Sequence, residues 1–387
     1  MAEKRIISPH PFPWLDYSRY AFSMGVEKGG VLFLSGQSAS QYDSSLGRVV
    51  CKGDVVEQTR LVYQKLGRVL EAAGAGFDDV VKTVDYLAPQ GLADYRGTAK
   101  VRREHFKGSW PASTGVVVER LLRADALIEV DAVAVLDAKK HAINPGWPRY
   151  DNLTYHPGVQ AGDLLCLSGF TGALPSQQPP LLKEQMANID RSIEAVLREA
   201  GATTGDLVKR VDYVASNCLE GYRSTTGLGP SARTGVGVNR LLRSEPCIEV
   251  ETAAVLDGRR EEIDPPDWAG RHAGPAAVRK GRFLFLSSQS AFDHPGDSVA
   301  GEGDLITQAT QTYANIRQVV EAAGCTMKDV VKTTEFITAD ALESYRGVGQ
   351  LRREVFGGEF PAATGVVVNS LMRPGLLIQV DAIAIRD

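Results

Sequence analysis

One pattern occurs three times along the 387-residue chain, and this repetition constrains the fold more than any other feature. Each unit begins with a strand-like stretch: "GGVLFLSGQSAS", "GDLLCLSGFTGA" or "GRFLFLSSQSAF". A helix with 3.6-residue apolar periodicity follows, as in "VYQKLGRVLEAAGAG", and then a strand such as "VVKTVDYL". After a polar helix, two strands such as "TGVVVERLL" and "LIEVDAVAVL" end each unit. The order β-β-α-β-α-β-β predicts an α+β fold in which helices cover one face of a sheet.

Two joints rich in proline separate the units, "HAINPGWPRY" and "EEIDPPDWAG". We therefore divide the chain into three units, residues 1–140, 141–260 and 261–387.

Bulk composition excludes several classes of protein. Apolar residues make up 43% and charged residues 23%, which is typical of a globular protein. A net charge of −4 without a long basic run argues against nucleic-acid binding. The sequence shows neither an apolar signal core nor an apolar run of membrane-spanning length, so we expect a cytoplasmic protein with no membrane partner. The cysteines form no C-x-x-C pair and the histidines are scattered, so we expect no disulfide and no metal. Without a phosphate-binding Gly loop, we also expect no cofactor.

The repeated motifs carry a family resemblance. The hairpin strand around "LF-SGQ", the helix ending "EAAG", the "VVK-T-" strand, and a "PAR"-type strand followed by "-EIE-IA" recur in the same order. Each unit thereby resembles a domain of the Rid superfamily, the reactive intermediate deaminases. That resemblance implies homotrimers with clefts between neighbouring subunits. Three fused copies then imply an intramolecular pseudo-trimer whose three clefts need not be identical.

The resemblance also implies roles for two residues of the second unit. The family arginine, which holds a substrate carboxylate, falls on Arg233 in "SARTGV", and the family glutamate, which activates water, falls on Glu249 in "CIEVE". Glu251 is the alternative base. The other two units depart from the pattern at the equivalent positions, with Ser113 and Glu129 in the first unit and Ala363 and Gln379 in the third. We therefore expect a single competent cleft, centred on the second unit.

Further residues complete the expected site. Those expected to bind substrate beside Arg233 are Tyr17, Tyr150, Ser168, Gly169 and Thr234. Gly235 stands where the family often has cysteine, which argues against thiol chemistry. A serine nucleophile in "SGQ" is disfavoured because no histidine or lysine occupies a repeated partner position.

Strand periodicity suggests where the charged residues point. In a strand, successive side chains point to opposite faces, so Arg233 faces away from Thr234 and Glu249 away from Val250. If the apolar sets meet the helices, Arg233 and Glu249 share the opposite face, which packs towards the neighbouring units. Two interpretations stay open there: an anion-binding site, which suits a planar guanidinium, or a salt bridge that ties units together.

The second unit is also shorter than the others. Between Tyr222 and Thr234 it lacks the "KVRREHFKGSWP"-type segment and has the Gly-rich "TTGLGPSA" instead. A shorter rim would widen the cleft, although neutral shortening explains it equally well. Two sets of basic residues recur in all three units, so we expect them to be part of the scaffold: Arg123, Arg243 and Arg373, and Lys82, Lys209 and Lys332.

These observations favour a cofactor-free hydrolytic deaminase that releases ammonia from a small enamine or imine carboxylic acid. One alternative is a specialised enzyme on another carboxylate substrate, such as a chorismatase-like hydrolase or a biosynthetic enzyme. Another is a non-catalytic small-molecule-binding protein. We expect the small carboxylate to be its partner, and the chain to be either a monomeric pseudo-trimer or a homo-oligomer of it.

Overall fold

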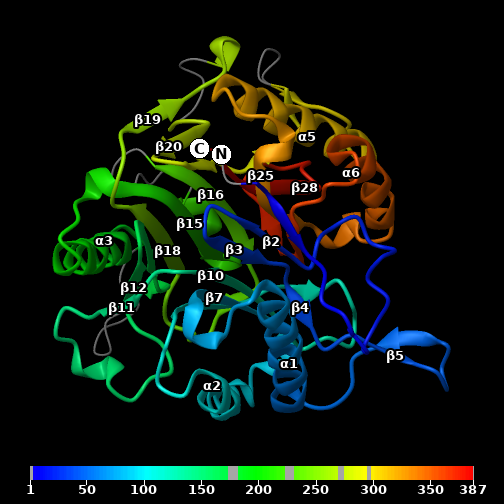
Figure 1. The fold of residues 1–387 in the computed structure, drawn as a ribbon. Helices are drawn as coiled ribbons and strands as arrows, with labels where there is room; N and C mark the ends of the chain where they lie inside the picture. The colour runs from blue at the N-terminus through cyan, green and yellow to red at the C-terminus, as the bar shows by residue number, and fades with distance from the viewer. Residues whose placement is uncertain (1–2, 173–181, 223–230, 269–273, 294–297, 387) are drawn as a thin grey trace.

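Residues 3–172, 182–222, 231–268, 274–293 and 298–386 are described by the computed structural model. Three mixed β-sheets surround a common centre, and the long helices lie on the periphery (Figure 1). The arrangement is the α+β pseudo-trimer that the repeats predict.

Each unit contributes seven of the eight strands of one sheet. The first sheet contains β1 (Arg5–Ile7), β2 (Gly25–Lys28), β3 (Val31–Leu34), β4 (Gln37–Ser38), β7 (Val80–Leu87), β8 (Ala112–Val117), β10 (Ile128–Val135) and β17 (Arg240–Leu241). The second contains β11 (Lys140–Ile143), β12 (Gly158–Ala161), β13 (Leu164–Leu167), β14 (Phe170–Thr171), β15 (Leu207–Ala215), β16 (Ala232–Val238), β18 (Ile248–Val255) and β27 (Ser370–Leu371). The third contains β19 (Arg260–Ile263), β20 (Ala277–Lys280), β21 (Phe283–Leu286), β22 (Gln289–Ser290), β25 (Val330–Ile337), β26 (Ala362–Val367), β28 (Ile378–Ile385) and β9 (Arg120–Leu121). Two small hairpins stand apart: β5 (Gln41–Asp43) with β6 (Arg48–Val50), and β23 (Phe292–Asp293) with β24 (Ser298–Val299).

The helices follow from local sequence signals. They are α1 (Val55–Ala73), α2 (Thr98–Phe106), α3 (Leu182–Glu199), α4 (Leu219–Tyr222), α5 (Leu305–Ala322) and α6 (Val348–Phe356). At the start of α1, the Asp54 side chain accepts hydrogen bonds from two backbone N–H groups, and Glu57 bonds back to the Asp54 N–H. The helix ends at Gly74, whose φ of 80° favours glycine.

The eighth strand of every sheet comes from a different unit, which closes the three units into a ring. Strand β8 of the first unit pairs with β17 of the second, and β16 of the second pairs with β27 of the third. The ring closes because β26 of the third unit pairs with β9 of the first. No sheet is therefore complete within a single unit.

Alternation along the central strands separates a ring axis from a helix layer. In β15, Lys209 and Val211 line a cavity on the axis. Arg210, which lies between them in the sequence, points to the opposite face and donates a hydrogen bond to Asp190 of α3. This is the two-residue period of a strand with one face on the axis and the other under the helices.

The pairing of β15 places Arg233 and Glu249 on opposite faces of the second sheet. Arg233 lies directly beside Arg210 in the parallel pairing with β16, so it shares the helix-facing side. Glu249 lies beside Tyr213 in the antiparallel pairing with β18, so it faces the axis. The expectation that both residues share a face is wrong. Their partners on β15, Arg210 and Tyr213, are an odd number of residues apart and therefore point to opposite faces.

Two further details differ from the sequence analysis. The expected boundaries between units fall one residue inside β11 and one residue inside β19, which begin at Lys140 and Arg260. The expectation of no disulfide is wrong, because Cys218 and Cys247 are joined. The end of β15 and the start of β18 are neighbours, with Val214 opposite Ile248, and this brings the cysteines together without any C-x-x-C spacing.

Candidate functional site at the junction of the second and third units

Three junctions between units share one set of backbone contacts. At each junction a residue of the "TGV" strand donates its N–H to a serine hydroxyl of the next unit, and its carbonyl accepts the N–H of the residue after that serine. We name the junctions by their units: junction 1–2 joins Ser113 to Ser168 and Gly169, junction 2–3 joins Arg233 to Ser287 and Ser288, and junction 3–1 joins Ala363 to Ser35 and Gly36.

Arg233 and Glu249 lie at different junctions. Arg233 is at junction 2–3, whereas Oε1 of Glu249 lies 3.5 Å from the backbone N of Gly115 at junction 1–2. At junction 2–3 the position equivalent to Glu249 is occupied by Gln379 of the third unit, whose Nε2 donates to the carbonyl of Gly235 at 3.0 Å. The prediction that Arg233 and Glu249 form one site is therefore wrong. Each junction combines the "TGV" strand of one unit with the strand of the next unit that carries Glu249 or its equivalent. The arginine and glutamate positions of one unit therefore lie at two different junctions.

The other predicted residues are spread over the molecule. Ser168 and Gly169 lie at junction 1–2, and Tyr150 is buried close enough to Glu249 for that charge to act on its pKa. Tyr17 belongs to the first unit, where its hydroxyl donates to the carbonyl of Pro9 at 2.9 Å. None of these groups contacts Arg233.

Thr234 and Glu251 lie on the axis instead. The Thr234 hydroxyl donates to Asp381 at 2.8 Å, and Glu251 pairs with Lys82 at 3.0 Å. These contacts belong to a ring of ion pairs in which the lysine of each unit meets an acid of the next unit: Lys82 with Glu251, Lys209 with Asp381, and Lys332 with Asp131. The scaffold role expected for the three lysines is confirmed. Glu251 is the partner of Lys82 in this ring, which argues against its predicted role as a base.

Beneath Arg233 lies a fully buried carboxylate. Asp212 of β15 has 0% side-chain exposure, and its Oδ2 lies 2.8 Å from Nη2 of Arg233. Arg210 donates its Nε to the other oxygen at 2.7 Å, and the Tyr222 hydroxyl also bonds Asp212. Burial alone would raise the pKa of Asp212, but the two guanidinium groups and the hydroxyl hold it below the usual value.

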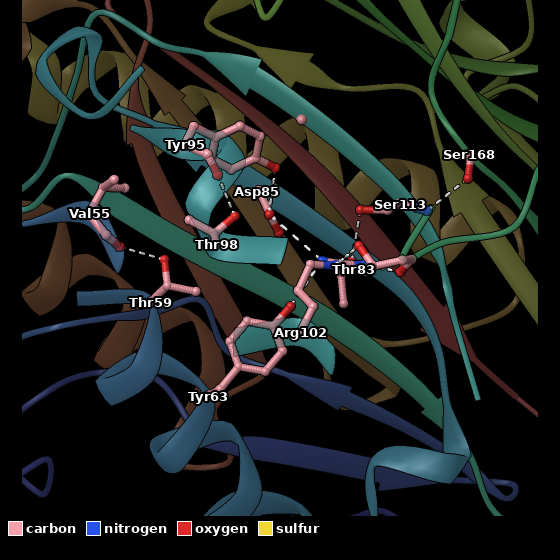
Figure 2. A network of polar contacts seen from close by, with 12 residues as sticks. Val55, Thr59, Tyr63, Thr83, Asp85, Tyr95, Thr98, Arg102, Ser113 and Ser168 are labelled. Atoms are coloured by element: carbon pink, nitrogen blue, oxygen red, sulfur yellow. Dashed lines mark hydrogen bonds and ion pairs between the residues drawn. The ribbon is translucent and has the colours of Figure 1, made fainter. Parts of the chain in front are cut away.

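The first and third units carry a buried acid at the same position with a different partner, and Figure 2 shows the pair of the first unit. In the first unit Asp85 accepts from the Tyr95 hydroxyl and lies 3.7 Å from Nη1 of Arg102, a residue of α2. In the third unit Glu335 lies 2.9 Å from Arg352 of α6. The helix that follows the central strand therefore supplies the balancing cation in both units.

The second unit has no such helix among its described residues, because α4 ends at Tyr222 and residues 223–230 lie outside the described part. The predicted Gly-rich rim, residues 225–232, falls on these residues except for Ser231 and Ala232. The sequence explains the cation at position 233: the missing segment is the one that carries Arg102 and Arg352 in the other units. A buried carboxylate without a cation is strongly destabilising. Arg233 and Arg210 together compensate for the lost helix arginine.

Arg233 nevertheless keeps one side open. Its side chain is 26% exposed, and among the described residues only its Nη2 has a hydrogen-bonding partner. It lines a cavity of about 330 Å³ at junction 2–3. The described lining contains two arginines, two glutamines and several serines, and none of its described residues is acidic: Ser231, Arg233, Gly235, Trp268, Gly274, Pro275, Ala276, Ser287, Ser288, Gln289, Ser290, Phe292, Met372, Arg373, Leu376 and Gln379.

A paired change accompanies the missing acid. At the other junctions Gly36 and Gly169 stand so close to Glu129 and Glu249 that a Cβ would collide with the carboxylate. At junction 2–3 the equivalent residue is Ser288, whose hydroxyl accepts from Nε2 of Gln379 at 2.8 Å. The Gln379 amide thus has a side-chain hydrogen-bonding partner in Ser288, whereas Gly36 and Gly169 offer no side chain to Glu129 and Glu249.

The glutamates at the other two junctions are buried. Burial raises the pKa of Glu249 to about 7 and the pKa of Glu129 to about 8. A carboxyl with a pKa near neutrality is suited to proton transfer. Neither has an arginine opposite, because the "TGV" strands there carry Ser113 and Ala363. Among the described residues, no junction combines the family arginine with the family glutamate.

Sequence reasoning missed Asp212, Tyr222, Ser288 and Arg373 as residues of this region. Signals for two of them were present in the repeats. Each unit has an acid at the Asp212 position, and the only unit without the helix arginine is the unit that gains Arg233. Likewise, "SSQ" replaces "SGQ" in the one unit where glutamine replaces glutamate.

The family described as "Endoribonuclease L-PSP" matches residues 17–136 and 267–386, which is more than half of the chain. The chain belongs to this family, and the match covers the first and third units. A RutC family protein of Pyrococcus horikoshii is 38% identical over 29% of this chain and 85% of its own length. The mouse protein named 2-iminobutanoate/2-iminopropanoate deaminase is 34% identical over 30% of this chain and 80% of its own length. These relatives confirm the resemblance to Rid proteins and indicate a deaminase-like role for the family.

Among solved structures, a putative endoribonuclease L-PSP from Entamoeba histolytica is 27% identical, with a TM-score of 0.30. It covers 33% of this chain and all of its own length. Within the described part of the chain, no helix is long and apolar enough to cross a membrane. No group of three or more His, Cys, Asp or Glu in that part is placed to hold a metal.

Proposed function

We propose that the protein binds a small carboxylic acid in the cavity at junction 2–3, with Arg233 holding the carboxylate. The observation that carries this proposal is a partly exposed guanidinium facing a cavity whose described lining contains no acidic residue. Asp212 fixes one edge of the guanidinium. The remaining N–H groups suit a carboxylate, which accepts two parallel hydrogen bonds from arginine.

Binding has better support than base-assisted hydrolysis. The base predicted from the sequence, Glu249, lies at junction 1–2 and cannot act on a ligand held by Arg233. Gln379 occupies the equivalent position at junction 2–3, and an amide does not accept a proton at neutral pH. A protein that keeps the anion-binding arginine and replaces the base is suited to holding a ligand.

A second candidate is imine hydrolysis at the same cavity. It is favoured by the name of the mouse relative and of a human relative, which is 32% identical over 30% of this chain. In that reaction water adds to the imine carbon and a proton passes to nitrogen. The C–N bond then breaks, which releases ammonia and gives a 2-oxo acid. Orientation by Arg233 would then be the main contribution of the protein.

The test is calorimetric titration with 2-oxobutanoate, a stable analogue of the imine acid. Arg233→Gln alone would leave Asp212 short of a cation, so the informative variant is Arg233→Gln/Asp212→Asn. We expect this variant to bind at least about tenfold more weakly than wild type, because a charge-assisted contact is lost. The control is Asp212→Asn alone, which keeps Arg233 and should keep binding. Equal affinity of wild type and the double variant would overturn the proposal.

A rate measurement separates the two candidates. Freshly generated 2-iminobutanoate is supplied, and ammonia release is followed with wild type and the double variant. Binding without acceleration supports the first candidate. Acceleration that disappears with Arg233 supports the second.

A further inference from the structure

We propose that the ligand of junction 2–3 carries a second acidic group, as a dicarboxylic acid does, and that Arg373 binds it. This inference rests on the proposed function and adds the class of ligand. Arg373 belongs to the third unit, whereas Arg233 belongs to the second, and both line the same cavity.

Strand exchange brings the two arginines together. Strand β27 of the third unit runs antiparallel to β16, with Leu371 opposite Val236. The chain after Leu371 therefore runs back along β16 towards Arg233. Met372 confirms this direction, because its Sδ lies 3.2 Å from the position that a Cβ on Gly235 would occupy. Arg373, the next residue, follows Met372 towards Arg233.

Arg373 is exposed and has no acidic partner among the described residues. Its guanidinium lies over the ring of Phe292, with 4.0 Å between Cζ and the ring centroid. A cation held on an aromatic face keeps its N–H edge available for an anion. Phe292 lines the same cavity, so the stacking holds Arg373 at the cavity wall.

The equivalent arginines at the other junctions have different neighbours. Arg123 donates to the Tyr20 hydroxyl at 3.2 Å in the unit that supplies Glu129 to junction 3–1. At junction 1–2, burial raises the pKa of Glu249, and Arg243 is one of the charges that oppose this rise. Gln379 removes the corresponding carboxylate at junction 2–3.

The charge of the cavity follows from these residues. Arg233 is paired with Asp212 along one edge, whereas Arg373 has no acidic partner among the described residues, so a monocarboxylate held by Arg233 would leave Arg373 without an anion. A dicarboxylate offers a second charge-assisted hydrogen-bonding group to Arg373. The cavity of about 330 Å³ lies in the range that holds small molecules.

The experiment compares matched acids by calorimetry at low ionic strength: butanoate with succinate, and pentanoate with glutarate. We expect the better diacid to bind about tenfold tighter than the monoacid of the same length. Arg373→Gln should remove this advantage and leave monoacid affinity within about twofold of wild type. Arg123→Gln changes the net charge by the same amount outside the cavity and should keep the advantage.

The outcomes distinguish this inference from the proposed function. If mono- and diacids bind equally, or if Arg373→Gln leaves the diacid advantage intact, the inference fails while carboxylate binding by Arg233 stands. If neither acid binds, or if monoacid affinity does not depend on Arg233, the proposed function fails as well.

Discussion

Arg233 is explained by its own unit before it is explained by a ligand. It lies 2.8 Å from Asp212, an acid that is fully buried, and the described residues of the second unit contain no counterpart of the helix arginines Arg102 and Arg352. Its remaining N–H groups face the cavity of junction 2–3. One substitution has therefore both balanced a buried charge and placed a cation at a cleft. The interpretation of Arg233 as one half of a salt bridge that ties units together is wrong, because its partner is Asp212 of the same unit and not Glu249.

Glu129 leads to a prediction about pH. Burial and the nearby Asp131 raise its pKa from 4.5 to about 8, against the opposing charges of Lys332 and Lys65. Between about pH 4.5 and pH 8 the folded protein thus keeps a proton that the unfolded chain has released, so stability falls as pH rises through this window. Glu129→Gln cannot ionise, and its melting temperature should fall less than that of wild type between pH 5 and pH 8.

The measurement is the melting temperature as a function of pH for wild type and variant. Glu249 has the same sign of dependence and is present in both proteins, so the difference between the curves reports on Glu129. The exposed Glu343→Gln serves as the control and should leave the curve unchanged. Parallel curves for wild type and Glu129→Gln would contradict the raised pKa.

At the scale of elements, the sequence predicts each unit well and the contacts between units poorly. The helices and strands follow from periodicity and caps, as the ends of α1 show. The repeats also place Arg233 and Glu249 on strands, and the structure has them in β16 and β18. They cannot show which unit supplies each residue to a junction, because that depends on strands exchanged between units. The axial lysines were recognisable because they recur, whereas the acid that meets each lysine comes from the next unit.

The disulfide leads to a second prediction. Cys218 and Cys247 are separated by 29 residues. Closing a loop of that size lowers the entropy of the unfolded chain and so stabilises the folded protein by about 3–4 kcal/mol. Cys218→Ser/Cys247→Ser should therefore melt a few degrees below the oxidised wild type. Reducing agent should lower the melting temperature of wild type and leave the double variant unchanged.

A thiol count checks the pairing itself. The non-reduced protein, unfolded in denaturant, should show only the thiols of Cys51, Cys166 and Cys325. Titration of all five cysteines of the chain would show that the pair is open.

At the scale of the whole molecule, the three units are joined by strands exchanged within one chain. Each sheet receives its last strand from the next unit, and the ion pairs on the axis run from unit to unit in the same cyclic order. The edges of β8, β16 and β26 are thereby paired within the chain, and a paired edge does not recruit a further chain. We therefore predict a monomer of 41.7 kDa in solution.

Scattering combined with size-exclusion chromatography provides the measurement. A compact globule of this length should have a radius of gyration of about 21 Å. A markedly larger radius at monomer mass would indicate three separate domains, and a trimer mass would contradict the predicted monomer.

The beginning of the chain has a consequence for its connectivity. Nζ of Lys140, in the first strand of the second unit, donates to the carbonyls of Val80 and Ser109 in the first unit. Nζ of Lys4, in the segment that leads into β1, donates in the same way to Val330 and Glu359 in the third unit. The first unit thus packs on the third as the second packs on the first, although no peptide bond joins them. The cyclic order of the units is fixed by packing, and the point at which the chain is opened is not. A circular permutant that begins at the second unit and ends with the first would keep all three junctions.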